Sequence, residues 1–82
     1  MRYFDKLTVL TVPELWKKRS EIFNDTVADL NGSEVDSAGI AFLVRWSKSL
    51  GKNKLVLKGC GEDVLKLISI FELKPLFDTS ER

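Results

Sequence analysis

The chain has 82 residues, of which 44% are hydrophobic and 30% are charged, and its formal net charge at pH 7 is +1. This composition is typical of one small globular domain over residues 1–82, and the balanced charge provides no strong attraction to nucleic acid or anionic lipid. With one cysteine and no histidine, the chain cannot form an internal disulfide, a Ser-His or Cys-His catalytic pair, or the usual zinc sites.

The N-terminal part predicts a strand and a helix. Residues 3–10, "YFDKLTVL", contain β-formers in a loose apolar and polar mixture and indicate a short strand. A helix is expected over 11–23, with Thr11 as the cap, Pro13 in the first turn and Glu14 in a capping box. Its apolar stripe has Arg19 at the edge and consists of Leu15, Trp16, Ile22 and Phe23.

The middle of the chain predicts a buried strand followed by an amphipathic helix. Residues 26–30, "TVADL", form the strand, and the Asn-Gly pair at 31–32 is a strong turn signal. The helix begins near Ser37 and is ended by Gly51. Its inward positions recur with helical spacing and are Ile40, Leu43, Val44, Ser47 and Leu50.

The C-terminal part predicts one more strand and one more helix. Residues 52–59, "KNKLVLKG", have a continuous apolar centre that is typical of a central strand covered on both faces. A helix is expected within 60–73, and residues 74–82 indicate a turn or short strand with a polar tail over about 78–82. The inward positions of this helix are Val64, Leu67, Ile68 and Phe71. The β-α-β-α-β-α order predicts an α/β layer fold with a mostly parallel sheet.

Few residues suggest chemistry of their own. The pairs Glu34/Asp36 and Glu62/Asp63 lie at expected helix starts, where helix capping competes with acid-base catalysis as their role. Cys60 has either a packing or a redox role, and the basic run 17–19 forms either a solvated face or a contact for anionic lipid or a partner. No phosphate-binding loop, signal peptide or membrane-length apolar segment is visible, so we expect a cytoplasmic, non-enzymatic protein without metal or cofactor.

The stretch "VADLNGSEVDSAGIAFLVRWSKSLGKNKLVLKGCGEDVLKLISIFELKPLF" resembles a STAS domain. The elements that carry the resemblance are Asp29-Leu30-Asn31, Val35-Asp36-Ser37-Ala38-Gly39, the strand from Gly51 to Gly59 and the leucine-rich helix from Val64 to Leu73. The resemblance implies a STAS-like βαβαβα layer fold with helices packed on a small, mostly parallel sheet.

Within the family, the chain is most similar to the cytoplasmic STAS subunits of Mla phospholipid-transport ABC systems. This similarity implies a non-catalytic subunit that binds the transporter's ATPase and reaches the inner membrane only through that complex. The system maintains outer-membrane lipid asymmetry. The alternative is an anti-sigma-factor antagonist, in which a partner serine kinase phosphorylates the residue that corresponds to Ser37.

Two departures from the family pattern have expected consequences. Much of the family's first strand is missing, so we expect a bare sheet edge through which two copies of the chain could pair as a homodimer. The turn between Asp29 and Asp36 is also shorter than is usual in the family. This shorter turn affects the geometry around Ser37.

The motif predicts a partner-binding surface at the start of the middle helix. Ser37 is either an N-cap or first-turn residue, or an exposed hydroxyl whose phosphorylation would place negative charge on a docking face beside Asp36. The small residues Ala38 and Gly39 are expected to let a partner backbone approach closely.

The helix that follows extends this predicted surface. Phe42 and Trp46 lie off the inward stripe, so they either cover a sheet edge or a neighbouring helix, or form an exposed apolar patch beside Ser37. We expect the patch, with Arg45 and Lys48 as its polar rim. The predicted partner-binding residues are thus Asp36, Ser37, Ala38, Gly39, Phe42, Arg45 and Trp46.

Overall fold

The computed structural model describes residues 1–79. The strands are β1 (Arg2–Tyr3), β2 (Lys6–Leu7), β3 (Val27–Asp29), β4 (Glu34–Val35), β5 (Leu55–Lys58) and β6 (Phe77–Asp78). The helices are α1 (Val12–Lys17), α2 (Arg19–Ile22), α3 (Ser37–Ser49), α4 (Glu62–Ile70) and the 3-10 helix η1 (Lys74–Leu76). Part of the predicted polar tail, residues 80–82, lies outside the described residues.

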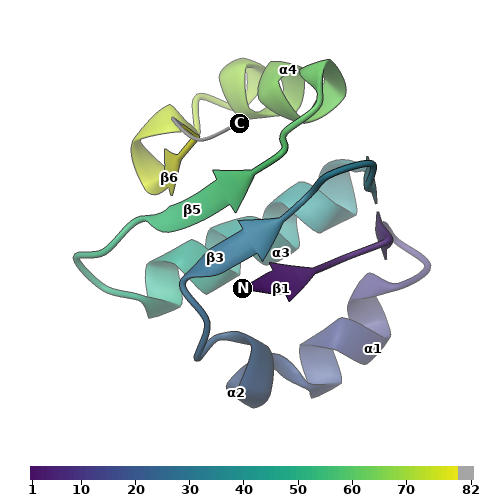
Figure 1. The fold of residues 1–82 in the computed structure, drawn as a ribbon, viewed down its shortest axis with the longest axis vertical. Helices are drawn as coiled ribbons and strands as arrows, with labels where there is room; N and C mark the ends of the chain where they lie inside the picture. Colours follow the sequence, from purple (N-terminus) through teal and green to yellow (C-terminus); the bar gives the residue numbers. More distant parts are fainter. Residues whose placement is uncertain (80–82) are drawn as a thin grey trace.

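The main sheet has the strand order β1-β3-β5-β6, and all of its pairings are parallel. Within this sheet, helices lie between each strand and the next along the chain, because parallel neighbours need a crossover connection. In Figure 1, α3 lies behind β3 and β5, while α1 and α2 lie on the β1 side and α4 lies on the β5–β6 side. The predicted α/β class with a small, mostly parallel sheet is therefore confirmed, and the arrangement is compatible with an α/β layer fold. A separate two-stranded parallel pair joins β2 to β4.

Strand β5 lies inside the sheet, as predicted, but its two faces are not equally covered. Leu55 and Leu57 are fully buried and belong to the hydrophobic core, whereas Val56 and Lys58 on the other face are only half-buried. Successive side chains of a strand point to opposite faces. The continuous apolar run therefore contributes one buried face and one partly covered face, which corrects the expectation of two covered faces.

The N-terminal segment is divided more finely than predicted. The expected strand over 3–10 becomes β1 and β2, because Phe4 between them turns into the core and Ser33 donates a hydrogen bond to its carbonyl. The expected helix over 11–23 becomes α1 and α2, which meet at Lys18. Thr11 does not cap α1 through its side chain, because its hydroxyl instead bonds backbone groups of Lys6 and Thr8. The predicted capping box is therefore wrong.

The last predicted helix is shorter than its apolar pattern. Val64 and Ile68 are buried as expected, but α4 ends at Ile70, and Glu72 has the left-handed φ of 56°. Phe71 therefore leaves the inward stripe and is 50% exposed, which corrects its predicted inward position. Among residues 1–79, no helix combines the length and apolar character that a membrane span requires.

Candidate functional site

The start of α3 is built around the carboxylate of Asp36. Its Oδ1 accepts a hydrogen bond from the backbone N–H of Gly39 at 3.0 Å, and its Oδ2 accepts one from the backbone N–H of Val9 at 2.9 Å. These donors, Val9 first and then Gly39, lower the pKa of Asp36 because they stabilise the charged form. Asp36 is therefore the N-cap of α3 and also connects the helix to the loop after β2.

Ser37 is the first residue of α3, and its side chain is exposed. Asp36 takes the cap position, so the Ser37 hydroxyl is not needed to cap the helix. No hydrogen bond of this hydroxyl is recorded within residues 1–79. Ser37 is therefore a first-turn residue and not the N-cap, and its phosphorylation stays a prediction.

The two small residues after Ser37 have different surroundings. Gly39 is buried, and a Cβ added to it would overlap the backbone carbonyl of Leu7 in β2. Its small size allows β2 to approach α3 within the domain, so the expected contact between Gly39 and a partner is wrong. Ala38 is half-buried.

The prediction that Phe42 and Trp46 form an exposed patch is also wrong. Their side chains are 2% and 0% exposed, and both belong to the core. The Trp46 ring stacks on Phe23 with centroids 6.1 Å apart and meets Phe4 edge-to-face at 5.9 Å. Its indole N–H donates a hydrogen bond to the carbonyl of Asp25 at 2.9 Å.

The physical reason is that α3 is buried on two flanks. Ile40 and Leu43 belong to the core cluster together with the strand residues Leu55 and Leu57, and Phe42 and Trp46 pack against aromatic rings from other segments. The helical spacing correctly separated Phe42 from the inward stripe. It could not show that a second layer covers that flank, which was the alternative open from sequence.

A third flank of α3 remains open beside Ser37. It borders an apolar groove of about 380 Å³ between α3 and the segment after α4. The groove is lined by Ser37, Ile40, Ala41, Val44, Arg45, Phe71 and Leu73. Only Ser37 and Arg45 of this set were predicted as site residues. Phe71 was missed because it fitted the inward pattern of α4, and the residues after it carry no strong stop signal.

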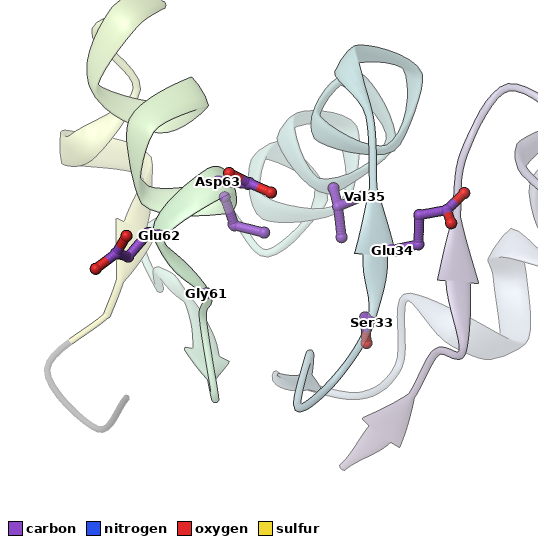
Figure 2. Close-up of a pocket in the computed structure, with 7 residues that line it drawn as sticks. Ser33, Glu34, Val35, Gly61, Glu62 and Asp63 are labelled. Atoms are coloured by element: carbon purple, nitrogen blue, oxygen red, sulfur yellow. The ribbon is translucent and has the colours of Figure 1, made fainter.

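A second cleft, of about 400 Å³, lies between β4 and the N-terminus of α4. Figure 2 shows Asp63 between α4 and Val35, whereas the carboxylates of Glu62 and Glu34 point away from the space between the two elements. Within the described part of the chain, no three acidic, histidine or cysteine side chains are grouped to hold a metal ion. Glu62 and Asp63 lie in the first turn of α4, where the helix dipole favours negative charge.

Comparisons of the chain with protein-family models, with curated proteins and with solved structures find no match. The candidate site is therefore defined by its own geometry. We call Ser37, Ala41, Arg45 and Phe71 the α3 docking face: these four residues line the apolar groove, and all four are exposed.

Proposed function

We propose that this chain is a non-catalytic STAS interaction subunit that binds a partner protein on the α3 docking face. The fold is compatible with this proposal, because strands and helices alternate around a small parallel sheet. The Val-Asp-Ser-Ala-Gly motif (35–39) begins in β4 and continues into α3, and this strand-to-helix position supports the proposal.

The single observation that supports the proposal best is the open groove beside Ser37. Phe71 lines this groove and is a large apolar side chain with half of its surface exposed. Exposed apolar groups that adjoin a groove favour contact with another molecule, because docking removes their surface from water. Arg45 borders the groove and supplies a charged rim, which is typical of protein interfaces.

For the partner, we propose the ATPase subunit of a phospholipid ABC transporter. This choice rests on the resemblance to the STAS subunits of Mla systems. A stabilising subunit of this kind needs a docking surface and no catalytic residues of its own. It would be held at the inner membrane through the transporter.

The proposal is tested by co-purification with the ATPase encoded beside the transporter permease. The informative variants are Ala41→Glu and Phe71→Ser, because both side chains are exposed and their replacement leaves the core unchanged. Tyr3→Ser is a matched control, since Tyr3 is 56% exposed on β1 and lies outside the groove. We expect both groove variants to lose the ATPase and the control to retain it.

Two results would contradict different parts of this proposal. Undiminished ATPase binding by both groove variants would show that the docking face is assigned wrongly. If the native chain retrieves no ATPase, the partner is wrong. Circular dichroism of each variant confirms that the fold is intact before binding is compared.

A second candidate function, a phosphorylation switch at Ser37, is favoured by the exposed hydroxyl at the first position of α3. A phosphate there would be favoured by the dipole of α3, and it would add about two negative charges beside the Asp36 carboxylate and the docking face. In this function the partner is an anti-sigma-factor serine kinase.

The switch is tested by incubation with the serine kinase encoded beside a sigma factor, followed by peptide mass spectrometry. We expect phosphate on Ser37 and none in Ser37→Ala. Ser33→Ala is the control, because the Ser33 hydroxyl donates a hydrogen bond to the carbonyl of Phe4 and is less accessible. Unchanged partner binding by Ser37→Asp would count against a switch.

A further inference from the structure

A further surface groove shares Arg45 with the apolar groove and has a different chemical character. It has a volume of about 510 Å³ and runs between the α1–α2 segment and the C-terminal half of α3. We call it the cationic groove. It is lined by Trp16, Arg19, Ser20, Phe23, Arg45, Lys48 and Ser49.

Two guanidinium groups in this groove share one aromatic ring. The guanidinium carbon of Arg19 lies 4.5 Å from the centroid of the Trp16 ring, and that of Arg45 lies 5.5 Å from it. Cation–π attraction holds both groups near the indole. Lys48 follows Arg45 by three positions on α3, so both project from neighbouring turns of one helix side. The fold therefore brings three positive charges to one groove.

These three charges have no counter-charge in the described part of the chain. The ion pairs recorded within residues 1–79 use other cations: the N-terminus and Arg2 pair with Asp25, Arg2 also with Glu21, and Lys17 with Glu14. No carboxylate lines the cationic groove. Like charges that are held together repel one another, and a bound anion removes this cost.

We propose that the cationic groove binds a phosphate group that carries at least two negative charges. Guanidinium groups match phosphate oxygens through paired N–H donors, and Lys48 adds a further cation. Nη1 of Arg19 already donates to the Trp16 carbonyl at 3.0 Å, so its other N–H groups are the donors that remain for a ligand. The hydroxyl of Ser20 offers another donor, while that of Ser49 already donates to the Trp46 carbonyl. A single carboxylate would balance only one of the three charges. The aromatic rings of Trp16 and Phe23 form an apolar wall, which reduces screening of the charges by water.

This site could not be found from the sequence. Arg19 fell at the edge of an apolar stripe, and the sequence favoured a solvated helix face for the basic run 17–19 over a contact for anionic lipid or a partner. The packing of α1 and α2 beside α3 brings Arg19 to the same ring as Arg45. The inference does not rest on the proposed function, because Arg19 and Lys48 do not line the apolar groove beside Ser37.

The test uses two probes that carry a phosphate group, one free in solution and one in a lipid headgroup. Binding of sodium pyrophosphate is measured by isothermal titration calorimetry, and binding to phosphatidylcholine vesicles with and without phosphatidic acid is measured by co-sedimentation. The variants are Arg19→Gln and Lys48→Gln, both at exposed positions. Lys66→Gln is the matched control, because it removes the same charge from an exposed position of α4 outside the groove.

We expect Arg19→Gln and Lys48→Gln each to weaken binding about tenfold, which corresponds to the loss of one charge-assisted hydrogen bond. The control should change it by less than about twofold, since a distant surface charge is screened by salt. Pyrophosphate binding with this pattern supports a site for a free phosphate compound. Binding only to vesicles that contain phosphatidic acid, with the same pattern, supports a site for a lipid headgroup. Absence of binding to both probes, or equal binding by the groove variants and the control, would overturn the proposal.

Discussion

The backbone N–H of Val9 donates a hydrogen bond of 2.9 Å to the carboxylate of Asp36, although the two residues are 27 positions apart. The same carboxylate caps α3 through Gly39. One side chain thus fixes both the helix start and the loop that follows β2. The Val9 and Leu10 side chains at the tip of that loop are exposed. The position of Ser37 is set by this arrangement, because it follows Asp36 directly.

The first prediction concerns the pH dependence that Asp36 gives to folding. Its pKa is lowered in the folded chain, so the unfolded chain binds the proton more tightly. The stabilisation is complete above the unfolded pKa of about 3.9 and is lost as the pH falls through the folded pKa. We expect native chain to be more stable than Asp36→Asn at neutral pH, with a difference that shrinks in acid. Urea unfolding of both chains at a series of pH values measures this difference in the free energy of unfolding. A difference that stays constant with pH would contradict this account.

The second prediction concerns the contact between Gly39 and β2. In Gly39→Ala the added methyl group would overlap the Leu7 carbonyl, so the helix and the strand must move apart. We expect a loss of about 1–3 kcal/mol in the free energy of unfolding, as is usual for overpacked sites. Ser69→Ala is the control, because Ser69 lies at an exposed position of α4 and the substitution adds no atoms. Similar stabilities of the two variants in urea would show that β2 does not press against α3.

The third prediction concerns the aromatic flank of α3. Because Phe42 is buried among Phe4, Phe23 and Trp46, Phe42→Ala should lower the free energy of unfolding by about 3–5 kcal/mol. This loss is comparable to the whole stability of a marginal domain. Lys66→Ala, at an exposed position of α4, should change it by less than about 0.5 kcal/mol. Loss of partner binding by Phe42→Ala with unchanged stability would instead restore Phe42 as a contact residue.

The fourth prediction concerns Ser47, whose position on the inward stripe was recognised from helical spacing. Its side chain is 4% exposed and its hydroxyl donates a hydrogen bond to the carbonyl of Leu76, which ties α3 to η1. Ser47→Ala should lower the free energy of unfolding by about 1 kcal/mol. Ser69→Ala, at an exposed position of α4, is the control. Equal effects of the two substitutions in urea would mean that this bond contributes nothing.

Local sequence patterns predicted most of the helices and strands, because the formation of such an element depends mainly on residues that are close in the sequence. The periodic apolar positions placed α3 from Ser37 onward, and the run Leu55–Leu57 marked an inner strand. The alternation of strands and helices then predicted the parallel sheet. Cys60 packs beside the core, the first of its two predicted roles. The break at Lys18 and the early end of α4 were not predicted, because no glycine or proline marks them.

The sequence by itself determined the alternation of helices with the main-sheet strands, the start of α3 and part of the inward stripe of that helix, since each follows from the spacing of residues along one segment. The tertiary structure alone decided whether the side chains off that stripe face the solvent. Phe42 and Trp46 became core because Phe4 and Phe23 cover them, and Phe71 became exposed because the chain turns at Glu72. Exposure depends on what packs against a flank from elsewhere in the chain, and the period of a single helix carries no information about that.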